Sequence, residues 1–139
     1  MLPPKEFLMA CREIAKQTIT IAAAGTSGSF TWPFGGAGIR HGARALYGVL
    51  IVPDWTNLET LTLVITDADT LTLYSKAAIA ENATYYLRRE DTSSWGGNTR
   101  TFDIPLIGIV TFTFTLTGVP GGTGGNITFK LWYDDGVNP

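Results

Sequence analysis

The sequence predicts an all-β protein, an antiparallel β-sandwich of about eight strands with a jelly-roll-like arrangement and a short N-terminal helix or arm. One observation is the segment VTFTFTLTG (residues 110–118), in which apolar residues alternate with threonine. Side chains along a strand alternate between its two faces, so this segment has one face to bury and one polar, uncharged face. A second observation is that such segments recur at even spacing, with turn residues between them. Two regions are expected: an arm or helix at residues 1–17 and a sandwich domain at residues 18–139.

The first predicted element is a short helix over residues 3–17. Prolines are tolerated in a first helical turn, and two of them begin this segment. Phe7, Cys11 and Ile14 then recur at helical spacing. A helix this short is marginal without a surface to pack on. The alternative is therefore an extended arm that becomes ordered only against a neighbouring subunit.

After Gln17 the apolar period changes from 3.6 to 2, which indicates strands. Residues 18–25 alternate, and residues 29–34 follow them across a Gly/Ser turn. Residues 35–45 form a glycine-rich loop. Residues 46–52 (LYGVLIV) are apolar on both faces, as expected of a central strand that a proline ends.

Two further strands are expected at residues 58–66 and 71–75, where leucine alternates with polar residues. The sequence DADT (67–70) between them is typical of a tight turn, so the two strands form a hairpin.

The last third of the chain contains more strands and two flexible connections. Residues 83–90 are a strand, and residues 91–98 (DTSSWGGN) are an exposed loop. Pro105 lacks a backbone N–H and is expected at a sheet edge or a bend. The glycine-rich residues 118–125 are a hairpin loop, which returns the chain through a final strand at residues 126–135.

The charge content argues against several classes of partner. Charged residues make up 16% of the chain and its net charge is −2, so no basic patch for nucleic acid or for an anionic membrane is expected. No stretch approaches the roughly 18 apolar residues of a membrane span. The first residues also lack the apolar run of a signal peptide, so synthesis in a cytoplasm is expected. The low charge is explained either by abundant Thr, Gly and Ser or by a partner that covers part of the surface.

The sequence offers no catalytic set, so no enzyme activity, cofactor or metal is predicted. His41 is the single histidine and Cys11 the single cysteine, and neither stands in a motif that activates a nucleophile. Acidic pairs such as Asp67/Asp69 and Asp134/Asp135 have the oxygens that Ca²⁺ prefers. Turn formation is the ordinary explanation for aspartates at strand ends, and calcium stays open as the alternative.

Two tryptophans are candidates for surface contacts. Trp95 lies in the Ser/Gly loop, and Trp132 lies on the outward face of the final strand beside Thr128 and Lys130 by parity. Exposed aromatic rings stack on sugar rings, and tryptophan also dominates protein–protein contacts. The sequence leaves both alternatives open.

Residues 38–136 resemble a known family. The pattern consists of GIRHGARALYGVLIV, LTLVITDADTLTL, TYYLRRE, FDIPLIGIVTFTFTLTG and GNITFKLWYDDG, in that order. It is similar to the short β-sandwich proteins encoded in the structural gene modules of tailed bacteriophages, namely capsid decoration (cement) proteins and related virion accessory proteins. The most distinctive element is the group Asp103, Pro105, Leu106 and Gly108.

The resemblance implies a structural role without enzyme activity. The chain would be made in the host cytoplasm and would bind the major capsid protein lattice on the virion exterior. It would associate with itself, trimers being a common arrangement, and would contact neither nucleic acid nor membrane directly. The alternatives are a tail or head–tail accessory protein and a carbohydrate-binding β-sandwich module. The candidate partner contacts are Phe7, Leu8, Ile14, Arg40, His41, Arg44, Trp95 and Trp132.

Overall fold

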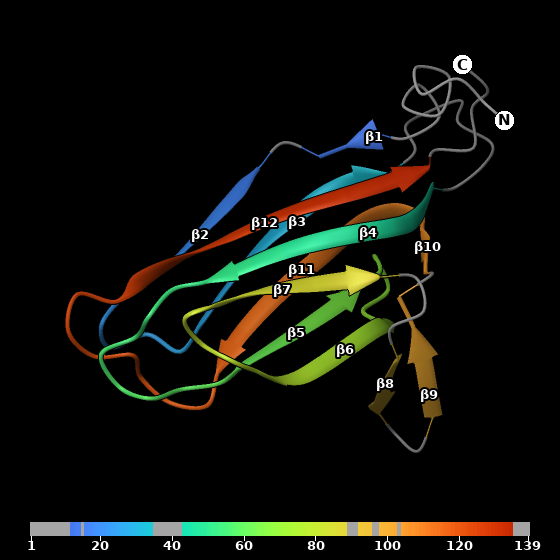
Figure 1. The fold of residues 1–139 in the computed structure, drawn as a ribbon. Helices are drawn as coiled ribbons and strands as arrows, with labels where there is room; N and C mark the ends of the chain where they lie inside the picture. The colour runs from blue at the N-terminus through green and yellow to red at the C-terminus, as the bar shows by residue number, and fades with distance from the viewer. Residues whose placement is uncertain are drawn as a thin grey trace, which may run out of the picture.

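The computed structural model describes residues 12–14, 16–34, 43–88, 92–95, 98–102 and 104–134. These residues form two antiparallel sheets packed face to face and a separate two-stranded hairpin (Figure 1). The predicted all-β sandwich is therefore confirmed.

The larger sheet, sheet A, is organised around β12 and β4, which pair along most of their lengths. Two short strands follow one another along the free side of β12, and two more follow one another along the free side of β4. The strands of sheet A are β1 (Arg12–Glu13), β2 (Gln17–Ile21), β12 (Gly125–Asp134), β4 (Ala43–Val52), β7 (Ala83–Arg88) and β10 (Pro105–Leu106). The predicted central strand is indeed central, and Pro105 lies at a sheet edge as expected.

The second sheet, sheet B, has the order β3-β11-β5-β6. Its strands are β3 (Ser27–Phe34), β11 (Gly108–Leu116), β5 (Leu61–Thr66) and β6 (Thr72–Ile79). The chain passes repeatedly from one sheet to the other, and each sheet has four strand positions, which is the jelly-roll arrangement. The hairpin predicted around residues 67–70 is formed by β5 and β6.

Four connections between the sheets lie together at one end, termed here the crossover end (residues 22–26, 53–60, 80–82 and 117–124). Backbone hydrogen bonds join these segments to one another. Asn57 N–H donates to the Pro120 carbonyl at 2.8 Å, and Gly121 N–H donates to the Ala23 carbonyl at 3.1 Å. The hairpin predicted at residues 118–125 is therefore wrong: this segment connects β11 in sheet B to β12 in sheet A.

Phenylalanine side chains fill the space between the sheets. Phe112 of β11 is fully buried, and its ring stacks on Phe30 of β3 with centroids 4.7 Å apart. It also packs against Phe129 of β12 in the opposite sheet, at 5.5 Å. Phe114 of β11 reaches the same ring at 5.8 Å. The alternation predicted for residues 110–118 thus places phenylalanine in the core and threonine on the outer face of sheet B.

The helix predicted over residues 3–17 is wrong for the part of this segment that the structure describes. Arg12–Glu13 form β1, which pairs with the end of β12. Ile14 N–H donates to the Leu131 carbonyl at 3.0 Å, and the Ile14 side chain is fully buried. The free side of β12 offers backbone partners and a core position, whereas an isolated short helix has neither. The rest of the segment lies outside the described residues.

The exposed loop predicted at residues 91–98 is replaced in part by strands. β8 (Thr92–Trp95) pairs with β9 (Asn98–Thr101), and both contact β6. Threonine and tryptophan favour strands, so the polar character of this segment concealed its hairpin.

Phe112→Ala is expected to lower the free energy of unfolding by ~3–5 kcal/mol, because it removes a ring that touches both sheets. Phe112→Leu should retain most of that stability. Chemical denaturation would measure both, with the exposed Thr115→Ala as control, for which about 1 kcal/mol or less is expected. Equal losses for Phe112→Ala and Thr115→Ala would contradict this description of the core.

Substitution of Gly124 tests the packing of the crossover end, and Gly108 at the start of β11 serves as the control. Gly124 and Gly108 have nearly the same left-handed φ, +72° and +71°, so alanine should cost about 1–2 kcal/mol at either position. A Cβ at Gly124 would overlap the Ile21 carbonyl oxygen, whereas a Cβ at Gly108 meets nothing within 4 Å. Gly124→Ala is therefore expected to lower the unfolding free energy by a further ~1–3 kcal/mol. Thermal denaturation of the pair checks this, and similar melting temperatures would count against it.

Candidate functional site

Three neighbouring aromatic side chains lie on the outer face of sheet A and are termed here the aromatic strip (Trp132, Tyr47 and Tyr86). They come from three adjacent strands, β12, β4 and β7. The Trp132 and Tyr47 ring centroids are 5.5 Å apart, and those of Tyr47 and Tyr86 are 6.2 Å apart with planes inclined by 29°. Tyr86 is 47% exposed. The strip is thus a preformed apolar surface that meets solvent.

Alternation along β12 determines which ring faces outward, and a β-bulge lies in the neighbouring strand β4. Trp132 pairs with Tyr47, but the next residue, Tyr133, pairs with Ala45, so Leu46 is the extra residue of β4. Tyr133 has the parity of the buried Phe129 and Leu131 and packs inward, with its ring 5.0 Å from Phe34 in an edge-on contact, while Trp132 is on the outer face. The bulge shifts the alternation of β4 instead, so that the buried Ala45 lies opposite Tyr133.

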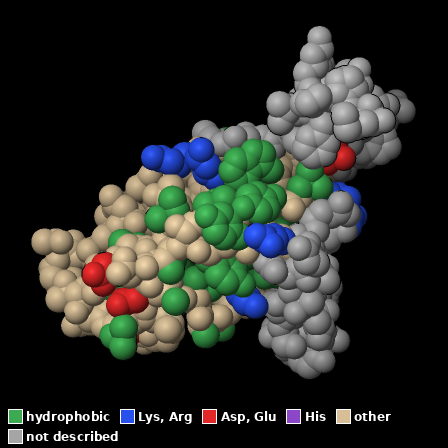
Figure 2. All heavy atoms as spheres, in the orientation of Figure 1, with side chains coloured by type: hydrophobic (Ala, Val, Ile, Leu, Met, Phe, Trp, Pro, Cys, Tyr) green, Lys and Arg blue, Asp and Glu red, His purple; other side chains and the backbone are tan. Residues whose placement is uncertain are grey.

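Basic and hydroxyl side chains border the aromatic strip. Lys130 places its Nζ 6.0 Å from the Trp132 ring centroid, and Arg88 is the cross-strand partner of Tyr47. Thr128 and Thr84 lie in the neighbouring row, on either side of Ile51. Figure 2 shows one continuous apolar patch over β12, β4 and β7, with basic side chains along its edges.

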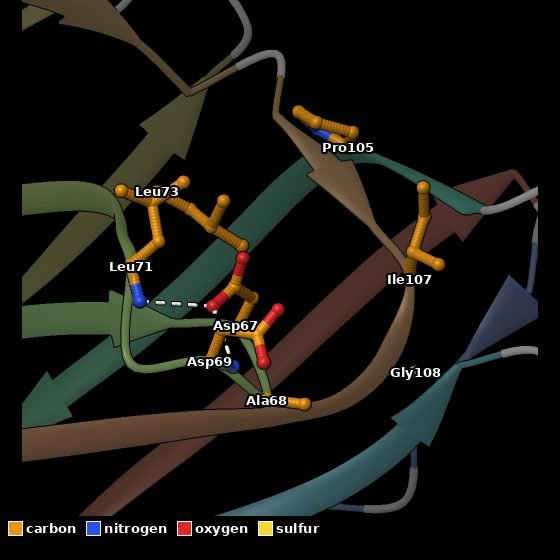
Figure 3. Close-up of a pocket in the computed structure, with 8 residues that line it drawn as sticks. All are labelled: Asp67, Ala68, Asp69, Leu71, Leu73, Pro105, Ile107 and Gly108. Atoms are coloured by element: carbon orange, nitrogen blue, oxygen red, sulfur yellow. Dashed lines mark hydrogen bonds between the residues drawn. The ribbon is translucent and has the colours of Figure 1, made fainter.

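A second surface is a hollow of about 480 Å³, termed here the apolar notch. It lies between the β5–β6 turn and the connection from β10 to β11. Leu71 and Leu73 approach it from one side, and Pro105 and Ile107 from the other (Figure 3). Leu71 is 57% exposed and Ile107 is 64% exposed.

The β5–β6 turn owes its shape to Asp67. Its Oδ1 accepts hydrogen bonds from the backbone N–H groups of Asp69 and Leu71, both at 2.9 Å (Figure 3). This pattern is an Asx turn, the ordinary role of aspartate at a strand end. The same hydrogen bonds hold Leu71 at the rim of the notch, so the turn positions one of its apolar walls.

The structure places the sequence-predicted contact residues in different environments. Trp132 belongs to the aromatic strip, and Arg44 is exposed at the start of β4, beside Pro105 in the pairing register. Ile14 is fully buried in the core, so its side chain forms no part of the described surface. Trp95 is the last residue of β8 and pairs with Asn98 of β9. Phe7, Leu8, Arg40 and His41 lie outside the described residues.

Sequence reasoning did not select the exposed aliphatic residues of the notch, Leu71 and Ile107, nor Ile109 of β11. Ile109 occupies an outward position of β11, in line with the threonines, and is 55% exposed. Its parity was visible in the sequence, since it stands two residues before Thr111. Tyr47 and Tyr86 had no comparable signal, because only strand pairing brings them beside Trp132.

The described surface offers contact chemistry: aromatic rings, aliphatic side chains and bordering cations. Within the described ranges, no three His, Cys, Asp or Glu side chains are grouped as a metal site requires. Among the same residues, no helix is long and apolar enough to cross a membrane.

No protein-family model matches the chain, and no curated protein sequence does. Solved structures with some similarity include a chain of the cyanophage Pam1 capsid asymmetric unit, at 19% identity over 86% of this chain and 84% of that one, with a TM-score of 0.42. A structure described as "CBM4 structure and function" is 15% identical over 86% and 67%, with a TM-score of 0.34. A chain of infectious bursal disease virus, Gx strain, is 11% identical over 91% and 35%, with a TM-score of 0.35. Similarity at this level assigns neither a family nor a function.

Asp67→Ala is expected to lower the free energy of unfolding by about 1 kcal/mol, because two backbone N–H groups lose their acceptor. Asp67→Asn keeps an amide oxygen in the same place and should retain most of the stability. Urea denaturation of the two variants compares them directly. If both lose the same amount, the negative charge matters and the turn hydrogen bonds do not.

Proposed function

We propose that this chain is a virion structural protein that decorates the capsid of a tailed bacteriophage. It binds the major capsid protein lattice from outside and stabilises the mature head. Two lines of support are the sequence resemblance over residues 38–136 and the jelly-roll architecture. The observation that carries the proposal furthest is the cluster of exposed aliphatic side chains around the apolar notch.

The apolar notch has the properties of a protein contact surface. Leu71 and Ile107 line it and are each more than half exposed, and fully burying such a side chain contributes about 1.5–3 kcal/mol. Clustered apolar surface of this kind marks interaction sites, whereas single scattered residues do not. Asp67 and Asp69 lie in the same hollow, so a complementary partner presents an apolar side chain with a basic neighbour.

Stabilisation of the head follows from linkage. A protein that binds the expanded shell and not its precursor lowers the free energy of the expanded state by RT ln(1 + [L]/Kd) at each site. The contribution recurs at every copy, so modest affinity at one site suffices to stabilise the whole shell. A rigid, preformed surface suits this role because little conformational entropy is lost on binding.

Particle composition tests the proposal. Cryo-electron microscopy and quantitative mass spectrometry of the virion that encodes the chain would give its position and copy number. A copy number in proportion to the major capsid protein supports decoration. A copy number of only a few would indicate a position in the tail or at the head–tail junction, and absence of the protein from the particle would overturn a virion role.

Ile107→Asn is expected to weaken binding to decoration-free capsids at least tenfold, which corresponds to about 1.4 kcal/mol. The side chain is mostly exposed, so the unfolding free energy should barely change. Thr115→Asn, on the exposed face of β11, is the matched control and should bind like the parent. Sedimentation of each variant with capsids measures occupancy. Unchanged occupancy for Ile107→Asn would place the capsid contact elsewhere on the molecule.

A further inference from the structure

We propose that the aromatic strip is a binding site for an acidic polysaccharide, separate from the apolar notch. This site goes beyond capsid attachment, because a protein held to a shell by one surface can present another to its surroundings. The inference rests on the arrangement of Trp132, Tyr47 and Tyr86, the groups that border them and the distribution of charge on sheet A.

The geometry of the strip suits a flat, extended ligand. Three rings stand side by side across three paired strands, at centroid separations of 5.5 and 6.2 Å. An aromatic face carries partial negative charge, so it attracts the polarised C–H groups on the face of a sugar ring. Each ring packs against its neighbour, so the platform exists before the ligand arrives and its ordering requires little entropy.

The border of the strip supplies the polar complement. Lys130 stands at one end of a cross-strand row that contains Val49 and Tyr86, and Arg88 stands at the opposite end of the row that contains Tyr47 and Trp132. Two cations therefore bracket the rings diagonally. Basic side chains form charge-assisted hydrogen bonds with carboxylate or sulfate groups, which neutral sugars lack.

The charge of this face differs from that of the whole chain. Outward-facing positions of β12, β4 and β7 hold three basic side chains, Lys130, Arg88 and Arg44, and one acidic side chain, Asp134, the cross-strand partner of Arg44, among the residues described there. On the neighbouring strand β1, Glu13 is the cross-strand partner of Trp132. The full chain has a net charge of −2. Lys130 and Arg88 are the basic residues in the cross-strand rows that hold the rings, and these two favour an anionic ligand.

The notch and the strip carry different kinds of side chain, and this difference favours a protein partner for the notch and a sugar ligand for the strip. Large exposed aliphatic side chains gather around the notch, and such groups have no specific affinity for sugars. The strip instead combines aromatic faces, cations and the hydroxyl groups of Thr128 and Thr84, with Ile51 between those two threonines. Hydroxyl groups match a ligand that is itself rich in hydroxyl groups.

Affinity electrophoresis and isothermal titration of the full chain would test the site. The acidic probes are polygalacturonate, hyaluronate and chondroitin sulfate, and dextran is the neutral probe. Saturable binding to at least one acidic polymer is expected, with little binding to dextran and a decrease as salt concentration rises. Trp132→Ala, Tyr86→Ala and Lys130→Gln should each weaken binding at least tenfold, and Trp132→Phe should retain most of it.

Ile107→Asn is the control that separates the two proposals, since it alters the notch and should bind polysaccharide like the parent. The unfolding free energy of each strip variant would be measured alongside, and Tyr86→Ala is the most informative because that ring is the most exposed of the three. Absence of saturable binding to all the acidic polymers would overturn the inference, as would equal binding to dextran. Loss of capsid occupancy in the strip variants, without polysaccharide binding by the parent, would make the strip a protein contact and overturn it too.

Discussion

Phenylalanine rings packed between the two sheets determine which side chains of the sandwich are buried and which face outward. Phe112 and Phe114 extend from sheet B toward Phe129 of sheet A, with centroids 5.5 and 5.8 Å apart. Side chains alternate along a strand, so burying this set fixes the opposite set on the surface. A slip of one residue in register would exchange the two faces. The aromatic core therefore specifies that threonine covers sheet B and that the aromatic strip lies outside sheet A.

The two ends of the sandwich are built differently, and the difference explains where the notch lies. Connections at the crossover end pass between the sheets and bind one another, as the reciprocal bonds of Thr60 and Thr117 illustrate: Thr60 N–H donates to the Thr117 hydroxyl at 3.1 Å, and Thr117 N–H donates to the Thr60 carbonyl at 3.0 Å. The notch belongs to the other end, where the β5–β6 turn meets the β10–β11 connection. That end is free to present side chains, as loops on a rigid scaffold commonly do.

Sequence periodicity predicted those parts of the fold that depend on local order. The alternation of residues 110–118, the central strand and the turn at Asp67 all follow from neighbouring residues. The structure of the N-terminal segment does not follow from its neighbouring residues, because Ile14 is equally consistent with a helix and with a strand. The partner of that strand, β12, lies more than a hundred residues away. Glycine in residues 118–125 indicated a turn but not which sheet the next strand would join. The strip depends on the pairing of β12, β4 and β7, which local periodicity does not specify.

The notch and the strip belong to the same small domain, so each copy bound to a capsid through the notch would also present a strip. Three partly exposed rings with two bordering cations form a small site, and a small site binds one polysaccharide segment weakly. A decorated shell would present the site at every copy, and the linked sites would engage one polymer with an effective concentration that far exceeds the free one. Avidity of this kind can exceed single-site affinity by a factor of roughly 10²–10⁴ without any new contact. A modest affinity of each strip is therefore compatible with firm attachment of a particle, because repetition of the site on the capsid would supply the avidity that one copy lacks.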